Sequence, residues 1–94
     1  LGPGYQVHLA EQVRGEAEIP TMAVGMITDG RQAEAIVANG QADMVALARG
    51  MLFDPHWAWH AAEDLGVEIP YPPQYLRSRP SLWPQAFSAR TAAE

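Results

Sequence analysis

The sequence contains no cysteine and no lysine, and its apolar runs are short. The missing cysteine excludes a disulfide staple and a thiol nucleophile. A membrane-spanning helix needs roughly 18 or more consecutive apolar residues, and every apolar run in this chain is far shorter. The first residues also lack the charged start and apolar centre of a secretory leader. From these absences we expect a soluble, cytoplasmic protein that is neither secreted nor inserted into a membrane.

Positive charge is also scarce in this sequence. The six basic residues are all arginines and are scattered along the chain, whereas eleven residues are acidic, so the net charge is −5. A nucleic-acid-binding surface needs clustered positive charge, and this balance argues against one. Any anion that binds here must therefore be held by a few local groups.

The length limits what the chain can do alone. Its 94 residues, 48% of them hydrophobic, allow one domain at most. A chain of this size buries only about 60 to 65% of its unfolded surface, so independent stability is marginal. The sequence also shows no serine-centred triad and no clear acid/base pair, so we expect no self-contained catalytic centre.

Two apolar stretches have the length of buried strands. "IPTMAVGM", residues 19–26, contains no charge, and its length favours a strand buried on both faces. "DMVALA", residues 43–48, is a second apolar stretch, and Arg49 and Gly50 end it. We therefore predict two short strands in this half of the chain.

A helix is predicted between the two strands. Asp29 and Gln32 have the spacing of a capping box, apolar residues follow at helical intervals, and Asn39 and Gly40 form a stop signal. The order strand, helix, strand with short connections predicts parallel strands joined by a crossover.

Two more helices are predicted on either side of this unit. The first contains Val7 and is closed by Gly15. The second is capped by Asp54, has Pro55 at its first position and ends at Gly66. These helices complete an α/β pattern.

From residue 69 onward the sequence becomes rich in proline and aromatic residues, with prolines at positions 70, 72, 73, 80 and 84. Such a segment is predicted to be extended and not helical. It either packs on its own domain or forms a semi-rigid arm that carries Arg77 or Arg79 to another subunit.

The ends of the two predicted strands form the candidate site. In a parallel arrangement the carboxyl ends of neighbouring strands lie side by side, so backbone N–H groups near Gly25, Ala48 and Arg49 converge. Glycine permits close approach of an oxyanion, and the Arg49 guanidinium adds a full positive charge, so a phosphate group suits this point. Alternatively, Gly25 only relieves crowding at a strand end and Arg49 is solvated.

The histidines are weaker candidates. His56 and His60, in "HWAWH", have the spacing of metal ligands on one helix face, but no third ligand is evident, and we expect no metal site. Trp57 and Trp59 in the same stretch cannot share a face. His8 is expected to be a helix-face residue and not a catalytic base.

Several segments, in the same order and at compatible spacing, resemble the C-terminal quarter of the Old Yellow Enzyme family, in its bacterial, thermophilic-like ene-reductase branch. The segments are "PGYQV" at 3–7, "AVGMITDG" at 23–30, "ARGMLFDPHWAWHAA" at 48–62 and "PQYLR" at 73–77. The resemblance implies an α/β fold, namely the last two βα units of a (β/α)₈ TIM barrel followed by an extended Pro-rich C-terminal arm. Residues 1–66 would be the barrel segment, with strand 7 at 22–26 and strand 8 at 44–48, and residues 67–94 the arm.

The resemblance also implies a cofactor and a reaction. The family binds FMN, takes hydride from NAD(P)H and delivers it to the β-carbon of an α,β-unsaturated carbonyl compound, a small-molecule enone. In this chain, Gly25, Ala48 and Arg49 would offer backbone N–H groups to the FMN phosphate, Arg49 would add its side chain, and Met26 would lie near the flavin edge. Relatives often have Gly-Arg in place of Ala48-Arg49, a change that keeps the backbone donor.

The resemblance further implies partners. Arg77, in "QYLR", matches an arginine that reaches into the neighbouring subunit of a homo-oligomer and shapes its substrate pocket, and Arg79 or Trp83 could share that role. The family's proton-donating tyrosine, carbonyl-binding pair and flavin-modulating residue lie on earlier strands, so no catalytic residue falls in this chain. We therefore expect a fragment that needs the remainder of the barrel and does not catalyse alone.

Two other functions are compatible with the sequence. The first is another FMN- or phosphate-binding TIM-barrel enzyme that uses the same strand ends for a different reaction. The second is a noncatalytic association module whose purpose is the arm.

Overall fold

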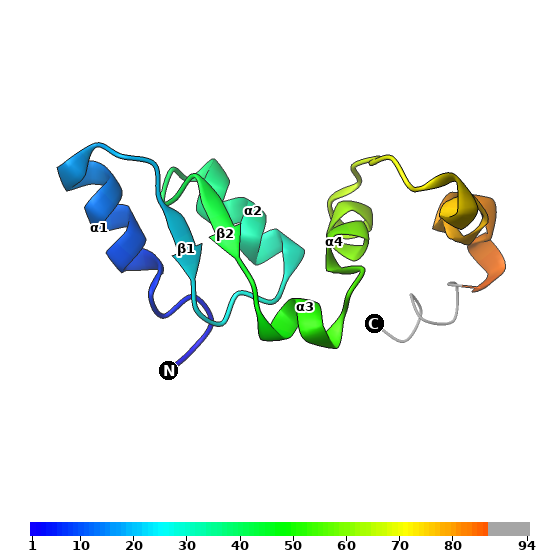
Figure 1. Ribbon diagram of the computed structural model, residues 1–94, viewed down its shortest axis with the longest axis horizontal. Coiled ribbons are helices and arrows are strands. Elements are labelled where there is room, and N and C mark those ends of the chain that lie inside the picture. Colours follow the sequence, from blue (N-terminus) through cyan, green and yellow to red (C-terminus); the bar gives the residue numbers. More distant parts are fainter. Residues whose placement is uncertain (87–94) are drawn as a thin grey trace.

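The computed structural model describes residues 1–86 and has alternating helices and strands followed by short 3₁₀ helices (Figure 1). In chain order these are α1 (Val7–Ala17), β1 (Met22–Val24), α2 (Gly30–Ala38), β2 (Met44–Ala46), α3 (Arg49–Phe53), α4 (Trp57–Leu65), η1 (Pro73–Ser78), η2 (Pro80–Leu82) and η3 (Pro84–Ala86). The last residues of the predicted arm, 87–94, lie outside the described part of the chain.

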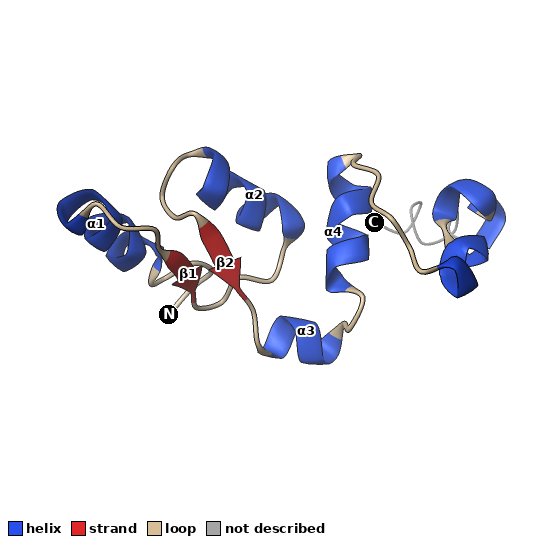
Figure 2. Ribbon diagram, turned by 45° about the horizontal axis from the view of Figure 1, so that its top comes forward, coloured by secondary structure: helices blue, strands red, loops and turns tan. Residues whose placement is uncertain are grey.

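The two strands form a parallel sheet, with Met22 opposite Met44 and Val24 opposite Ala46. Figure 2 shows them side by side, and α2 makes the connection between them. The predicted strand, helix, strand unit with parallel strands is therefore confirmed. Both strands are shorter than the predicted ranges 22–26 and 44–48. After β1 the extended conformation stops because Gly25 has φ +115° and Met26 φ +49°.

One face of this sheet carries the core. Ala23, which is 1% exposed, packs in a cluster with Ile27, Ala33 and Ile36 of the following loop and α2. Successive side chains of a strand point to opposite faces of the sheet. Met22, Val24 and Met44 point to the face away from the core, and each is about half exposed. The prediction that the strand in residues 19–26 is buried on both faces is thus wrong for the described residues 1–86, because Met22 and Val24 on its second face are half exposed.

The start of α2 follows its predicted signature. The Asp29 carboxylate accepts a hydrogen bond from the Gln32 backbone N–H at 3.3 Å, and the Gln32 side-chain oxygen accepts one from the Thr28 N–H at 3.2 Å. In a standard capping box the second bond comes from the backbone N–H of the N-cap residue, whereas here it comes from Thr28, one residue earlier. Asn39 caps the other end, and Gly40 follows at φ +73°, so the predicted stop is confirmed.

Helix α1 continues past Gly15, where it was predicted to end. Its last turn is held from outside, because the Arg14 side chain donates to the Asp43 carboxylate at 3.1 Å and to the Gly40 carbonyl at 2.9 Å. The left-handed stop falls on Glu18 instead, at φ +55°, with its N–H on the Arg14 carbonyl. Tertiary contacts therefore override the local stop signal at Gly15.

The segment predicted as one helix begins differently from expectation. A short helix, α3, occupies Arg49–Phe53, where the sequence indicated only a strand end, and α4 begins at Trp57. The sequence predicts Asp54 as the cap and Pro55 as the first residue of this helix, and both predictions are wrong, because a turn separates α3 from α4: His56 is the N-cap of α4, and Pro55 lies in the turn before it. The Asp54 carboxylate accepts from the His56 N–H at 3.1 Å within that turn. The end of α4 at Gly66, with φ +70°, is as predicted.

The proline-rich segment is not extended throughout, so that prediction is wrong for residues 73–86. Proline is the first residue of all three 3₁₀ helices. The proline ring fixes φ near −65°, a value that a 3₁₀ turn and an extended chain share. Short-range hydrogen bonds select the turn, such as the one from the Tyr75 N–H to the Pro72 carbonyl at 2.9 Å.

The molecule is elongated, with extents of 49 × 28 × 22 Å and a radius of gyration of 15.7 Å. A compact domain of this length has a radius of gyration of about 12 Å. Helix α1 lies at one end and the 3₁₀ helices lie at the other, beyond α4 (Figure 1). In the described part of the chain, no helix has the length and apolar character needed to cross a lipid bilayer.

Candidate functional site

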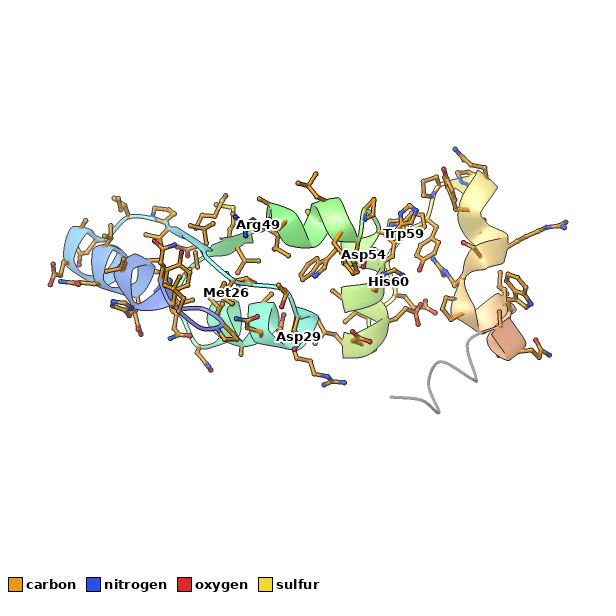
Figure 3. All side chains as sticks on the ribbon, turned by 90° about the horizontal axis from the view of Figure 1, so that it is seen from below. Met26, Asp29, Arg49, Asp54, Trp59 and His60 are labelled. Atoms are coloured by element: carbon orange, nitrogen blue, oxygen red, sulfur yellow. The ribbon has the colours of Figure 1, made fainter. Side chains whose placement is uncertain are left out.

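The carboxyl ends of β1 and β2 lie at one edge of the sheet because the strands are parallel and in register. The residues that follow them are Gly25 and Met26 after β1, and Ala48 and Arg49 after β2. Figure 3 looks onto this edge and labels Met26 and Arg49. The fold therefore brings the four predicted cofactor-binding positions to the same end of the sheet.

Gly25 is required by its own surroundings. Its φ of +115° is a conformation that residues with a side chain rarely adopt. An added Cβ would also lie 2.7 Å from the Gln6 amide nitrogen and 3.1 Å from a Tyr5 ring carbon. The explanation that Gly25 relieves crowding at a strand end therefore has direct support. It is compatible with a backbone that approaches a ligand closely.

Met26 is held in a left-handed conformation at φ +49°. Its carbonyl accepts hydrogen bonds from the Gly4 N–H and from the Gln32 side-chain amide, both at 3.2 Å. These two donors come from the N-terminal turn and from α2. They fix the loop that follows β1 before any ligand binds.

Arg49 begins α3, and Ala48 is its N-cap residue. The Ala48 carbonyl already accepts from Met51 and Leu52, whereas N–H groups at the start of a helix have no acceptor within it. The Arg49 side chain is exposed and makes no hydrogen bond or ion pair within residues 1–86. A full positive charge is thus available beside backbone donors.

Arg49 also lines a cleft of about 440 Å³ between the β1–α2 loop, α3 and the start of α4. The other residues of the cleft wall are Thr28, Gly50, Phe53, Asp54 and Trp57. The Trp57 indole N–H donates to the Thr28 carbonyl at 2.7 Å and so ties α4 to the loop after β1. This bond gives the cleft a fixed wall.

The acid of this cleft, Asp54, is already engaged. One carboxylate oxygen lies 2.6 Å from His60 Nδ1 and the other accepts from the His56 N–H (Figure 3). The hydrogen bond with His60 is the main reason that the pKa of Asp54 lies below its usual value. Because Asp54 is held in this way, it does not neutralise Arg49.

The other histidine candidates take structural places. His60 pairs with Asp54, and His56 stacks on Trp59 at 4.2 Å, so the two side chains do not share a ligand. Within residues 1–86 no three His, Cys, Asp or Glu side chains are grouped to hold a metal ion. His8 is exposed on α1.

The structure gives different surroundings to Arg77 and Arg79, the two arginines of the C-terminal segment between which the sequence did not decide. Arg79 lies over the Tyr71 ring at 4.6 Å and donates to the Ile69 carbonyl at 2.6 Å, whereas Arg77 is exposed and has no hydrogen bond or ion pair within the described residues. Tyr71 in turn stacks on Trp59 of α4. Trp83 is about half exposed on the segment after η2.

Sequence reasoning missed this stacking arrangement. The spacing of His56 and Trp59, three residues apart, does place them on one helix face. Their partners, Tyr71 and Tyr75, come from a segment with no helical period, so no pattern in the sequence connects them to α4.

The model of the NADH:flavin oxidoreductase / NADH oxidase family matches residues 2–68 of this chain. The chain belongs to this family. The match includes Gly25, Met26, Ala48 and Arg49 and ends before Arg77. The family's description names a flavin, in agreement with the predicted FMN, and the predicted resemblance to Old Yellow Enzymes is confirmed.

Similar proteins in this flavin oxidoreductase family come from several bacteria. The chain is 56% identical over 75 residues to the NADPH dehydrogenase of Geobacillus thermodenitrificans, 53% identical over 75 residues to that of Bacillus subtilis, and 47% identical over 76 residues to that of Listeria innocua. These alignments cover 80 to 81% of this chain and 22% of each relative. The chain therefore spans about a fifth of the length of the curated relatives it matches.

Proposed function

We propose that this chain supplies the FMN-phosphate site of an NADPH-dependent flavin oxidoreductase that reduces the C=C bond of α,β-unsaturated carbonyl compounds. The observation that carries the proposal is the Arg49 guanidinium, which has no partner within residues 1–86 and lies at the carboxyl edge of two parallel strands. Membership of a family described by its flavin supports the same assignment.

The chemistry of the donor set fits a phosphate. In this proposal Gly25, Ala48 and Arg49 offer backbone N–H groups, the Arg49 side chain adds a planar cation with several donors, and Met26, the residue after Gly25, would lie near the flavin edge. Charge-assisted hydrogen bonds from arginine to phosphate are among the strongest that proteins make. Since the chain as a whole has a net charge of −5, such local donors must provide the attraction.

In this proposal the residues of the chain bind and orient, and they do not react. When bound, the flavin supplies hydride transfer from NADPH to the β-carbon of the enone. The loop after β1 and the start of α3 hold the phosphate end, and the Trp57–Thr28 bond keeps the wall of the cleft in place. Activation of the substrate belongs to the rest of the barrel.

The remaining six βα units are the first partner of this chain in our proposal. Met22, Val24 and Met44 form the exposed face of the sheet, which other side chains of the barrel interior would cover in the complete barrel. Each of the two strands has one neighbour in the described residues, so both outer edges of the sheet are open to further strands.

A second copy of the protein is the other proposed partner. The C-terminal segment would act as an intersubunit arm of a homo-oligomer and bring Arg77 to the substrate pocket of a neighbouring subunit. The exposed position of Arg77, and the engagement of Arg79 within its own chain, support Arg77 for this role.

The test replaces Arg49 in the complete protein that carries this chain. We expect Arg49→Ala to weaken FMN binding by about 10- to 100-fold, because a charge-assisted hydrogen bond is lost, and Arg49→Lys to weaken it less. FMN affinity is measured by flavin fluorescence titration. Arg31→Ala is the control, because Arg31 is an exposed arginine that does not line the cleft and donates to the Asp64 carbonyl.

The same preparation is assayed for NADPH-dependent reduction of cyclohexenone. An FMN affinity that is the same in Arg49→Ala and in the parent protein would remove Arg49 from the site. Tight FMN binding without turnover of cyclohexenone or other enones would instead favour a different flavin reaction on the same barrel.

A further inference from the structure

Four planar groups connect α4 to the C-terminal segment. The Trp59 ring stacks with His56 at 4.2 Å and an interplanar angle of 12°, and with Tyr71 at 4.2 Å and 19°. The Arg79 guanidinium lies over the Tyr71 ring at 4.6 Å. We call these four groups, His56, Trp59, Tyr71 and Arg79, the stack.

The stack is reinforced by contacts around it. Tyr75 meets the Trp59 ring edge-on at 5.5 Å, and the Arg79 guanidinium donates to the Ile69 carbonyl at 2.6 Å. That hydrogen bond closes the chain between residues 69 and 79 into a loop. The Ser78 hydroxyl closes a smaller turn inside it by donating to the Tyr75 carbonyl at 2.6 Å.

Arg77 lies inside this closed loop but outside its contacts. It lies in the last turn of η1, whereas Arg79 follows η1 with an extended backbone at φ −64° and ψ 132°, so the two arginines differ in backbone conformation. Arg79 points back to Tyr71 and Ile69, and Arg77 is exposed. Arg79 therefore anchors the segment to its own chain, whereas Arg77 remains exposed.

We propose that Trp59, Tyr71 and Arg79 are positioning residues, which hold residues 69–79 on α4 so that Arg77 meets the substrate pocket of a neighbouring subunit in one orientation. This inference rests on the arm function proposed above. A loose proline-rich segment would distribute Arg77 over many positions, and ordering it on contact would weaken the interaction. The stack orders the segment beforehand, within its own chain.

The first test is a double-mutant cycle in the complete flavin-loaded protein. We expect Arg79→Ala to raise the KM for cyclohexenone roughly two- to fivefold, the range for loss of an exposed cation–π contact, with kcat unchanged. In the Arg77→Ala background, Arg79→Ala should have no further effect. Arg31→Ala is the matched control, because Arg31 also donates to a backbone carbonyl, that of Asp64 at 2.7 Å, but lies outside the stack.

The outcomes separate this inference from the arm function. If Arg77→Ala leaves the KM unchanged, the arm function fails and the positioning role fails with it. If Arg77→Ala raises the KM and Arg79→Ala does not, only the positioning role is overturned. An Arg79→Ala effect of the same size with and without Arg77 would also overturn it, because the effect would then not act through Arg77.

The second test measures the anchoring directly. Trypsin cleaves after arginine unless proline follows, so it cuts after Arg77 but not between Arg79 and Pro80. We expect Trp59→Ala to speed cleavage after Arg77 at least severalfold and Trp59→Phe, which keeps a stacking ring, to restore most of the protection. Thermal unfolding of both variants checks that they are folded, and cleavage at the parent rate in a folded Trp59→Ala variant would refute the positioning role.

Discussion

Gly25 has two separate reasons to be glycine, a backbone conformation and a lack of space. Its φ is +115°, and a Cβ there would lie within 3.1 Å of both Gln6 and Tyr5 side-chain atoms. Gly66 provides a comparison, since its φ of +70° lies in the ordinary left-handed region and a Cβ there would meet nothing within 4 Å.

We therefore predict that Gly25→Ala lowers the free energy of unfolding by about 2 to 3 kcal/mol, because strain and crowding add. Gly66→Ala should lower it by only about 1 kcal/mol, the cost of a left-handed alanine. Urea unfolding followed by circular dichroism compares the two variants with the parent protein. Equal losses would show that the surroundings of Gly25 adapt freely.

At the scale of single residues, part of the candidate site was predictable. Strand ends in a parallel sheet converge, so Gly25 and Arg49 could be placed at one edge from the pattern alone, and the structure has them there. The hydrogen bond between Asp54 and His60 was not predictable, because it depends on the direction in which α4 continues from the turn that contains Asp54.

At the scale of elements, α2 and α4 approach closely at one point. A Cβ added to Gly30, the first residue of α2, would lie 2.8 Å from the Ala61 Cβ and 2.9 Å from its Cα. The second contact is to backbone, so the clash cannot be relieved by turning a side chain. Gly15, inside α1, has open space at the same position.

We predict opposite effects for the two helical glycines. Gly30→Ala should lower the free energy of unfolding by about 1 to 3 kcal/mol, because α4 must move away from α2. Gly15→Ala should raise it by up to about 1 kcal/mol, since alanine favours the helix. Chemical denaturation of both variants measures this, and a Gly30→Ala protein as stable as the parent would contradict the close packing.

The elements were predictable where a local signal was complete. The capping box of α2 and the stop at Gly66 are examples, and both are present in the structure. Helix α3 was missed because five residues do not complete two helical turns and show no period. The 3₁₀ helices were missed because proline fixes φ but leaves ψ to be selected by neighbouring hydrogen bonds.

At the scale of the whole molecule, Asp43 connects several segments at the amino ends of the two strands, which is the end of the sheet opposite the candidate site. One carboxylate oxygen accepts from the Thr21 N–H at 2.9 Å and from the Arg14 side chain at 3.1 Å. These bonds join α1 and the approach to β1 with the approach to β2. The hydrogen bond from Arg14 is the main reason that the pKa of Asp43 lies below its usual value of 3.8.

A pH dependence of stability follows from that shift. Because the pKa of Asp43 is lower in the folded than in the unfolded state, its stabilising effect is complete above the unfolded pKa and is lost as the pH falls through the folded pKa. We predict that Asp43→Asn is less stable than the parent at pH 7, and that the difference shrinks as the pH falls below about 4.

Urea unfolding at a series of pH values measures this difference. Glu11→Gln is the control, since Glu11 is an exposed acid that makes no hydrogen bond or ion pair within residues 1–86. A gap between Asp43→Asn and the parent that stays constant from pH 7 to acid conditions would contradict the assigned role.

The open sheet of two three-residue strands has a consequence for how the chain behaves without its complement. Each strand has one neighbour in the described residues, so each presents an unpaired row of backbone donors and acceptors beside apolar side chains such as Met22 and Met44. Such edges recruit any strand that offers a match, including strands of other copies. In the barrel that we propose, a separately made remainder of the protein would compete with self-association of this chain for these two strand edges, so the chain is suited to a fragment-complementation experiment.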